Sequence, residues 1–134
     1  MGSRKPSFLQ PLLREPGVAY RINNSRNGRT VASTLLTAFD SATRRTGLLR
    51  HDSLTEGSAL IIAPSNAVHT IRMRFAIDIA FVARDGCIVK VCTALPPWRM
   101  AAAWRGFAVV ELPAGALAAA DTIAGDRLMV VRAG

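Results

Sequence analysis

Apolar and polar residues alternate most regularly between Ile71 and Phe81, where every odd position is apolar and the polar side chains fall on even positions. A period of two residues predicts a β-strand. The Asp85-Gly86 pair that follows predicts a tight hairpin into a second strand. A regular two-residue loop would place four pairs opposite one another: Arg84 and Cys87, Val82 and Val89, Ala80 and Val91, and Asp78 and Thr93.

Similar local patterns predict the other elements. A hairpin with Asn27-Gly28 in its turn is expected between VAYRI and RTVASTLLT. Asp40 can cap a short helix over SATRRTGLL, and a helical turn is expected at ALAAAD. Further strands are expected at SALIIAP, FAVVELPAG and RLMVV, whereas PPWRMAAAWRG is expected to form a loop.

The first seventeen residues are rich in residues that prevent regular structure: Pro6, Pro11, Pro16 and Gly17. They predict an extended, partly disordered N-terminal arm over residues 1–17, which can lie across the rest of the protein. Residues 18–134 then form a single β-rich domain. Half of the chain is hydrophobic, which is enough for one core without disulfides or metal.

The predicted elements add up to about seven short strands and one or two short helices. Asp78 shares its strand face with Ala80 and Val82, and the opposite face carries Ile79 and Phe81, so both faces of this ribbon are largely apolar. A sheet that is apolar on both faces is covered on both sides or closed on itself. The sequence therefore predicts a mainly β protein of the α+β class, built as a small closed or partly open β-barrel or as a sandwich.

The formal net charge of +8 arises from 15 Arg and 2 Lys against 9 acidic residues. Such a charge can mark a surface for nucleic acids or other anions. The basic residues are scattered along the chain, however, and no aromatic RNA-binding run is present. Nucleic-acid binding is therefore the less favoured interpretation of the charge.

Neither a metal site nor a membrane segment is expected. Cys87 and Cys92 lie five residues apart on a predicted strand, so they point to opposite faces and cannot pair with each other. No metal-binding spacing of Cys and His occurs, and no cofactor motif is evident. No apolar stretch of about 18 residues occurs, and the N-terminal apolar run is too short for a signal peptide, which predicts a cytoplasmic protein.

The motif HTIRMRFAID, the later DG and PPWR, and the segments ELPAG and GD together resemble the bacterial and archaeal family known as domain of unknown function 192. Ala76 departs from the proline that is usual in this family, and Ala83 from an acid. The resemblance implies a compact strand-rich domain and transfers no activity. The family's recurring positions correspond to Gly47, Leu48, His69, Thr70, Met73, Arg74, Ile77, Asp78, Phe81, Gly86, Glu111, Gly115, Gly125 and Asp126.

The polar members of this set are the candidate catalytic or binding residues. Asp78 and Glu111 can act as paired carboxylates with His69 and Arg74 as supports, which is the hydrolase hypothesis. Each has a structural alternative. Asp78 can be a buried lock that accepts bonds from Arg74 or from backbone N–H groups, and His69 can be a structural histidine. The structural alternative is favoured for both residues.

The segment with Trp98-Arg99 and Trp104-Arg105 is the candidate binding surface, because exposed Trp and Arg supply strong contacts to peptides, sugars or single-stranded nucleic acids. Alternatively, one tryptophan closes the end of a barrel, and Trp98 is the expected plug because Pro96-Pro97 precedes it. The favoured function is a non-enzymatic binding or accessory module for a small anionic ligand or a protein partner, with Arg74, His69, Asp78, Trp98 and Arg99 as ligand-binding residues. A hydrolase and a nucleic-acid-binding protein are the alternatives.

Overall fold

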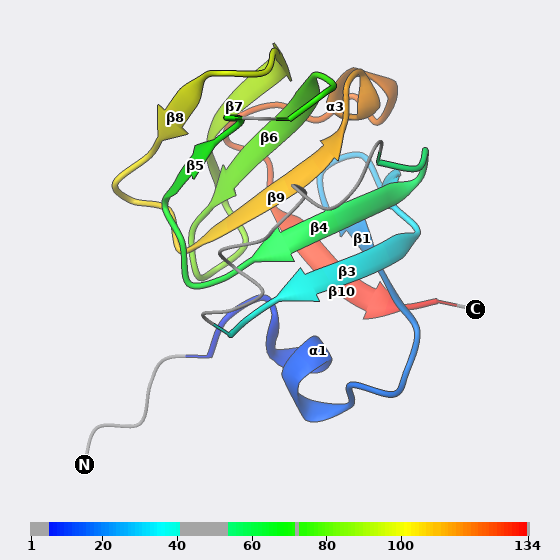
Figure 1. The fold of residues 1–134 in the computed structure, drawn as a ribbon. Coiled ribbons are helices and arrows are strands. Elements are labelled where there is room, and N and C mark those ends of the chain that lie inside the picture. Colours follow the sequence, from blue (N-terminus) through cyan, green and yellow to red (C-terminus); the bar gives the residue numbers. More distant parts are fainter. Residues whose placement is uncertain (1–5, 41–53, 72, 134) are drawn as a thin grey trace.

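The computed structural model describes residues 6–40, 54–71 and 73–133 (Figure 1). These residues form ten strands and two short helices. In chain order the elements are α1 (Gln10–Arg14), β1 (Tyr20–Asn24), β2 (Thr30–Ala32), β3 (Thr34–Ala38), β4 (Ser58–Ile62), β5 (Ala67–His69), β6 (Ile77–Val82), β7 (Ile88–Leu95), β8 (Met100–Ala102), β9 (Ala108–Pro113), α3 (Ala116–Ala119) and β10 (Leu128–Arg132).

Three sheets lie in layers. The central sheet has five strands in the order β3-β4-β9-β6-β7, a second sheet has the order β10-β1-β2, and β5 and β8 pair with each other. One hydrophobic cluster joins the central sheet to the three-stranded sheet, and a second cluster lies on the other face of the central sheet. Val68 and Ala101 of the β5–β8 pair pack against this second cluster. In Figure 1, β10 (red) passes behind the central sheet and β5 and β8 lie at its left.

The predicted fold class is confirmed in its main features. All residues of β4 and β6 are buried, as expected for strands that are covered on both faces. The closed barrel was the wrong alternative. Among the described residues no sheet closes, because β3 and β7 remain the two edges of the central sheet. The layered arrangement covers both faces of the sheet without closing it.

The hairpin between β6 and β7 has the predicted register only in its middle. Ala80 lies opposite Val91 as predicted, but Val82 lies opposite Ile88 instead of Val89. The loop contains one residue more than expected: the Ala83 N–H donates to the carbonyl of Cys87, and Gly86, at φ +93°, donates to the carbonyl of Ala83. A residue with positive φ after the turn is typical of three-residue hairpin loops with a bulge.

Two other predictions about the elements were wrong. The strand predicted from residue 71 begins only at Ile77, because the chain turns before it, with the Met73 N–H donating to the carbonyl of Thr70. The segment expected to be a loop after Pro97 contains β8. The expected helix over residues 41–49 lies outside the described residues.

The N-terminal segment packs against the rest of the domain. Residues 10–14 form α1, where the sequence predicts extended chain. Leu9 is buried in the hydrophobic cluster between the central sheet and the three-stranded sheet. The Phe8 N–H donates to the carbonyl of Arg84 in the β6–β7 hairpin. This contact ties the segment to the domain. Among the described residues no helix is long and apolar enough to cross a membrane.

Candidate functional site

Asp78 lies near the start of β6 and is completely buried. Its carboxylate accepts hydrogen bonds from the backbone N–H groups of Ala94 at 2.8 Å, and of Gly115 and Leu117 at 3.1 Å each. All hydrogen bonds that it accepts from described residues thus come from the backbone. Asp78 joins the end of β7 to the first turn of α3, which is the geometry of a structural lock.

Glu111 lies on the neighbouring strand β9 but on the other face of the sheet. In the antiparallel register Asp78 is opposite Leu112, whereas Glu111 is opposite Ile79. Residues directly opposite share a face and successive residues alternate. The two carboxylates are therefore separated by the sheet, and the pairing required by the hydrolase hypothesis is absent.

Glu111 is buried with an exposed fraction of 3 %. Its Oε2 atom has no hydrogen-bond partner among the described residues. Burial raises the pKa of the Glu111 carboxyl to about 7, because the charged form loses its hydration. Glu111 is thus a protonatable group on the face of the sheet that carries the second hydrophobic cluster.

Asp126 is a third buried carboxylate, and it holds two turns together. It accepts hydrogen bonds from the Asn24 side chain, from the Ile123 N–H and from Nε of Arg26 at 2.6 Å. The hydrogen bond from Arg26 holds the pKa of the Asp126 carboxyl well below its usual range. Asp126 therefore accounts for the predicted turn before β10, and its surroundings are those of a structural anion.

His69 and Arg74 do not join Asp78 in a buried cluster. His69 ends β5, is opposite Met100, and has an exposed side chain. Arg74 lies in the irregular segment before β6 and is exposed as well. Of the predicted ligand-binding residues, His69, Trp98 and Arg99 lie together along β5 and the approach to β8, and Asp78 is inside the protein.

Thr70 fixes the backbone between Pro96 and Arg99. Its buried hydroxyl donates to the carbonyl of Pro96 at 2.7 Å and accepts from the N–H of Arg99 at 2.9 Å. The Thr70 backbone exchanges further bonds with Trp98 and Arg99. Trp98, at φ +65°, is thereby held in a conformation that non-glycine residues rarely adopt.

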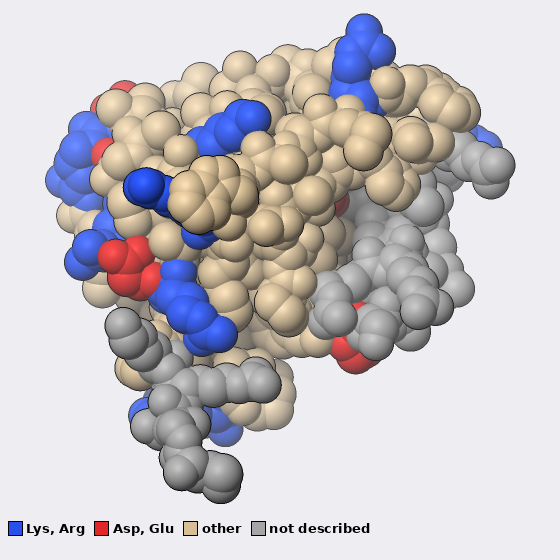
Figure 2. Space-filling model, turned by 90° about the vertical axis from the view of Figure 1, so that its left-hand side faces the viewer, with Lys and Arg blue, Asp and Glu red and all other residues tan. Residues whose placement is uncertain are grey.

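Three large apolar side chains in this segment and in and after β8 are exposed to solvent. The exposed fractions are 62 % for Trp98, 78 % for Met100 and 81 % for Trp104. The expectation that Trp98 plugs a barrel end was therefore wrong. We call the outward face of β5 and β8 with its flanking residues the Trp–Arg surface; it consists of Ala67, His69, Trp98, Arg99, Met100, Ala102, Trp104 and Arg105. Figure 2 views this side of the molecule and shows Lys and Arg side chains spread over a mainly uncharged face.

A groove runs beside this surface, between β7 and β8. It has a volume of about 480 Å³ and is lined by Val89, Lys90, Ala102, Ala103, Trp104 and Arg105. Nζ of Lys90 donates to the carbonyl of Ala102 at 3.0 Å, and the Arg105 guanidinium lies 5.2 Å from the centre of the Trp104 ring. The groove thus combines an apolar floor with an aromatic wall and two cationic groups. Sequence analysis missed Lys90, which stands alone among apolar residues.

Comparison with known proteins gives the family. The family model "DUF192: Uncharacterized ACR" matches residues 22–130. The chain belongs to this uncharacterised family. No curated protein matches it.

Two solved structures have a similar fold. One is a protein from Sinorhizobium meliloti described as a putative transcription regulator, with a TM-score of 0.72, 21 % identity, and coverage of 84 % of this chain and 92 % of the other. The other is a protein of unknown function from Novosphingobium aromaticivorans, with a TM-score of 0.68, 19 % identity, and coverage of 82 % of each chain. At these identities the likeness shows the fold alone.

Proposed function

We propose that this protein is a binding module that recognises an acidic segment of a partner protein through the Trp–Arg surface and the adjoining groove. One observation carries the proposal. Trp98, Met100 and Trp104 are largely exposed, yet their backbone is held in place: Thr70 bonds to the segment around Trp98, Met100 pairs with His69, and the Ala103 N–H next to Trp104 donates to the carbonyl of Asn66. A rigid backbone that holds large apolar side chains in water is typical of contact surfaces, because little ordering remains to be done on binding.

The charges around these side chains select the partner. Lys90 and Arg105 line the groove, and Arg99 follows Trp98. None of the residues that make up the Trp–Arg surface is acidic. Complementary charge accelerates association and favours partners that carry acids next to apolar side chains. Trp and Arg are also the residues most often found where truncation costs the most binding energy.

Two alternatives make different demands on the molecule. A hydrolase that uses Asp78 and Glu111 would need both carboxylates at one substrate atom, and they point to opposite faces of the sheet. We therefore do not propose this activity. Single-stranded nucleic acid would stack on Trp98 and Trp104, and its affinity would fall steeply with salt concentration. This alternative can be tested in the same experiment as the peptide.

The test uses intrinsic fluorescence, because the chain contains two tryptophans and both lie on the proposed surface. The protein is titrated with a synthetic peptide that alternates glutamate and leucine, with the same peptide carrying glutamine for glutamate, and with oligothymidylate. We expect the acidic peptide to shift the emission to shorter wavelength and to bind about tenfold more tightly than the glutamine peptide. Equal response to both peptides would contradict the proposal. Tight, steeply salt-dependent binding of oligothymidylate alone would replace it by the nucleic-acid alternative.

A further inference from the structure

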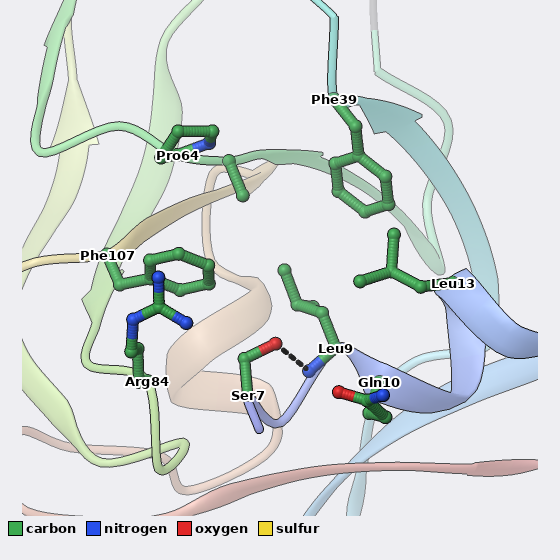
Figure 3. Close-up of a pocket in the computed structure, with 9 residues that line it drawn as sticks. Ser7, Leu9, Gln10, Leu13, Phe39, Pro64, Arg84 and Phe107 are labelled. Carbon is green, nitrogen blue, oxygen red and sulfur yellow. Dashed lines mark hydrogen bonds between the residues drawn. The ribbon is translucent and has the colours of Figure 1, made fainter. Parts of the chain in front are cut away.

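The N-terminal segment, residues 7–16, lies between two hollows of the surface. The first has a volume of about 380 Å³ and separates this segment from Phe39, Ala63, Pro64, Arg84 and Phe107 (Figure 3). The second has a volume of about 460 Å³ and separates the segment from Tyr20 and from β3. Leu13 and Phe39 line both hollows. The two hollows therefore adjoin each other, and the segment divides them.

The apolar walls of both hollows form one docking surface. We call this surface the N-terminal groove; it consists of Tyr20, Leu35, Phe39, Ala63, Pro64 and Phe107. Leu9 of the segment is 2 % exposed, and in Figure 3 its side chain points into the space between Phe107 and Phe39. Phe8 and Leu12 pack against the same hydrophobic cluster. The groove thus already has an apolar occupant, which comes from the same chain.

Few polar contacts hold this occupant. Among the described residues, one backbone hydrogen bond joins residues 7–17 to a distant part of the domain, from the Phe8 N–H to the carbonyl of Arg84. The ion pair between Arg132 and Glu15 is exposed on both sides, and such pairs add little stability. Most of the attachment therefore comes from the apolar side chains. A segment attached in this way can detach while the rest of the domain stays folded.

The occupant is also shorter than the groove. The helix α1 spans Gln10–Arg14 and ends before Pro16-Gly17, which cannot continue a helix. Leu13 remains 57 % exposed although it lines both hollows. A longer amphipathic helix would place further side chains in the two hollows and would bury more apolar surface than this segment does.

The groove and its occupant differ in their relation to the family. The family model matches residues 22–130. All residues of the N-terminal groove except Tyr20 lie in this part of the chain, whereas the segment that occupies the groove lies outside it. The docking surface is thus mainly a feature of the family domain, and the occupant is a separate element that packs on it.

We propose that the N-terminal groove is a docking site for a helical segment of a partner protein with leucines three positions apart, and that residues 8–13 of this chain occupy it until the partner displaces them. The chemistry of the partner follows from that of the occupant. Leu9 and Leu12 are three positions apart, so one helical turn brings both side chains to the groove. An amphipathic helix in an apolar groove is a recurring mode of recognition. The Trp–Arg surface is a separate site, and neither proposal depends on the other.

The experiment uses the full chain and a fluorescein-labelled peptide with the sequence of residues 6–17, and it follows binding by fluorescence anisotropy. In the wild type the peptide competes with the attached segment, whose local concentration is on the order of millimolar. Leu9→Ala weakens the attached segment and leaves the groove unchanged. We expect the peptide to bind this variant about tenfold more tightly than the wild type. A peptide that carries both Leu9→Ala and Leu12→Ala should bind neither protein.

Further variants separate competition from a loss of folding. Leu12→Ala, at a partly buried position, should also bind the peptide more tightly than the wild type does, and it gives the same comparison if Leu9→Ala does not fold. Leu36→Ala removes the same atoms from an exposed leucine of β3 outside the groove, and its affinity should equal that of the wild type. Circular dichroism and urea unfolding check that each variant is folded.

Backbone amide NMR locates the peptide on the folded variant. The signals of Leu35 and Phe107 should shift, and that of Met100 should not. Equal affinity of the peptide for the wild type and for the variants of Leu9 and Leu12 would overturn the proposal, as would shifts confined to the Trp–Arg surface. Analytical ultracentrifugation gives the remaining outcome. A wild-type dimer that the peptide dissociates would mean that two copies exchange the segment, which would overturn the assignment to a partner protein.

Discussion

Asp78 and Glu111 occupy adjacent strands of one sheet and point to its opposite faces, with Asp78 beside Leu112 and Glu111 beside Ile79. Their surroundings differ as much as their directions. The Asp78 carboxylate accepts three backbone hydrogen bonds, whereas one oxygen of Glu111 has no partner among the described residues. The two residues therefore have separate consequences for stability.

Asp78→Asn should lower the free energy of unfolding by about 2 to 3 kcal/mol. Asparagine keeps the shape of the side chain, but its amide group cannot accept the N–H bonds that one carboxylate oxygen receives, and buried donors are left unsatisfied. Urea unfolding monitored by circular dichroism measures the change. Asp121→Asn, at an exposed position 3.6 Å from Arg26, is the control and should change stability by less than about 1 kcal/mol. Similar losses in the free energy of unfolding for both variants would refute the structural role of Asp78.

Glu111 should make the protein less stable as the pH rises. Its pKa is raised from 4.5 to about 7 in the folded protein, so between these values the folded state holds a proton that the unfolded state has released. Stability is then fully present below pH 4.5 and is lost as the pH passes through 7, by about 3 kcal/mol in total. Urea unfolding at pH 5 and pH 8 tests this.

The matched variant is Glu111→Gln, which is uncharged at every pH. The decrease in the free energy of unfolding between pH 5 and pH 8 should become smaller, and at pH 8 this variant should be more stable than the wild type. If the two proteins lose the same free energy over this interval, Glu111 is not the group responsible.

Thr70→Val should loosen the loop that presents Trp98. Valine keeps the size of threonine but leaves the carbonyl of Pro96 without its donor and the N–H of Arg99 without its acceptor. We expect a loss of about 1 to 2 kcal/mol in stability and faster hydrogen exchange at the Arg99 amide. Thr70→Ser keeps the hydroxyl and should preserve slow exchange. Unchanged exchange in Thr70→Val would mean that the loop is held by other contacts.

Gly86→Ala should lower the free energy of unfolding of the protein more than Gly125→Ala does. Both glycines have φ near +95°, so both substitutions carry the same backbone strain. At Gly86 the added Cβ would also overlap the carbonyl oxygen of Leu128, whereas at Gly125 nothing lies within 4 Å of it. We expect the two variants to differ by about 2 kcal/mol in urea unfolding. Equal values would show that β10 does not press on the hairpin.

Local pattern was sufficient for elements whose neighbours in space are also neighbours in sequence. The Ala80–Val91 pairing follows from the Asp85-Gly86 turn and the apolar alternation. β4 was recognised from its apolar run alone, although its partners β3 and β9 are distant in sequence. The start of β6 could not be predicted, because alternation continues through residues 71–75 while the chain there is held by Thr70 to a loop about 26 residues away.

Long-range contacts also account for the rest of what sequence analysis missed. β8 lies in an alanine-rich segment without β-branched residues, so its strand depends on pairing with β5. Asp78 and Glu111 were recognised as isolated acids, but their faces required the register between β6 and β9. The cavity between the N-terminal segment and Phe39, Pro64, Arg84 and Phe107 is built from five distant segments, which no local pattern can bring together.

The affinity of Trp104→Ala for the glutamate–leucine peptide tests the central claim most directly. Trp104 is 81 % exposed, so this variant should unfold at the same urea concentration as the wild type. If the Trp–Arg surface is the binding site, the dissociation constant should rise about 30-fold, which corresponds to about 2 kcal/mol, measured by calorimetry. An unchanged dissociation constant in a normally folded variant would contradict the account.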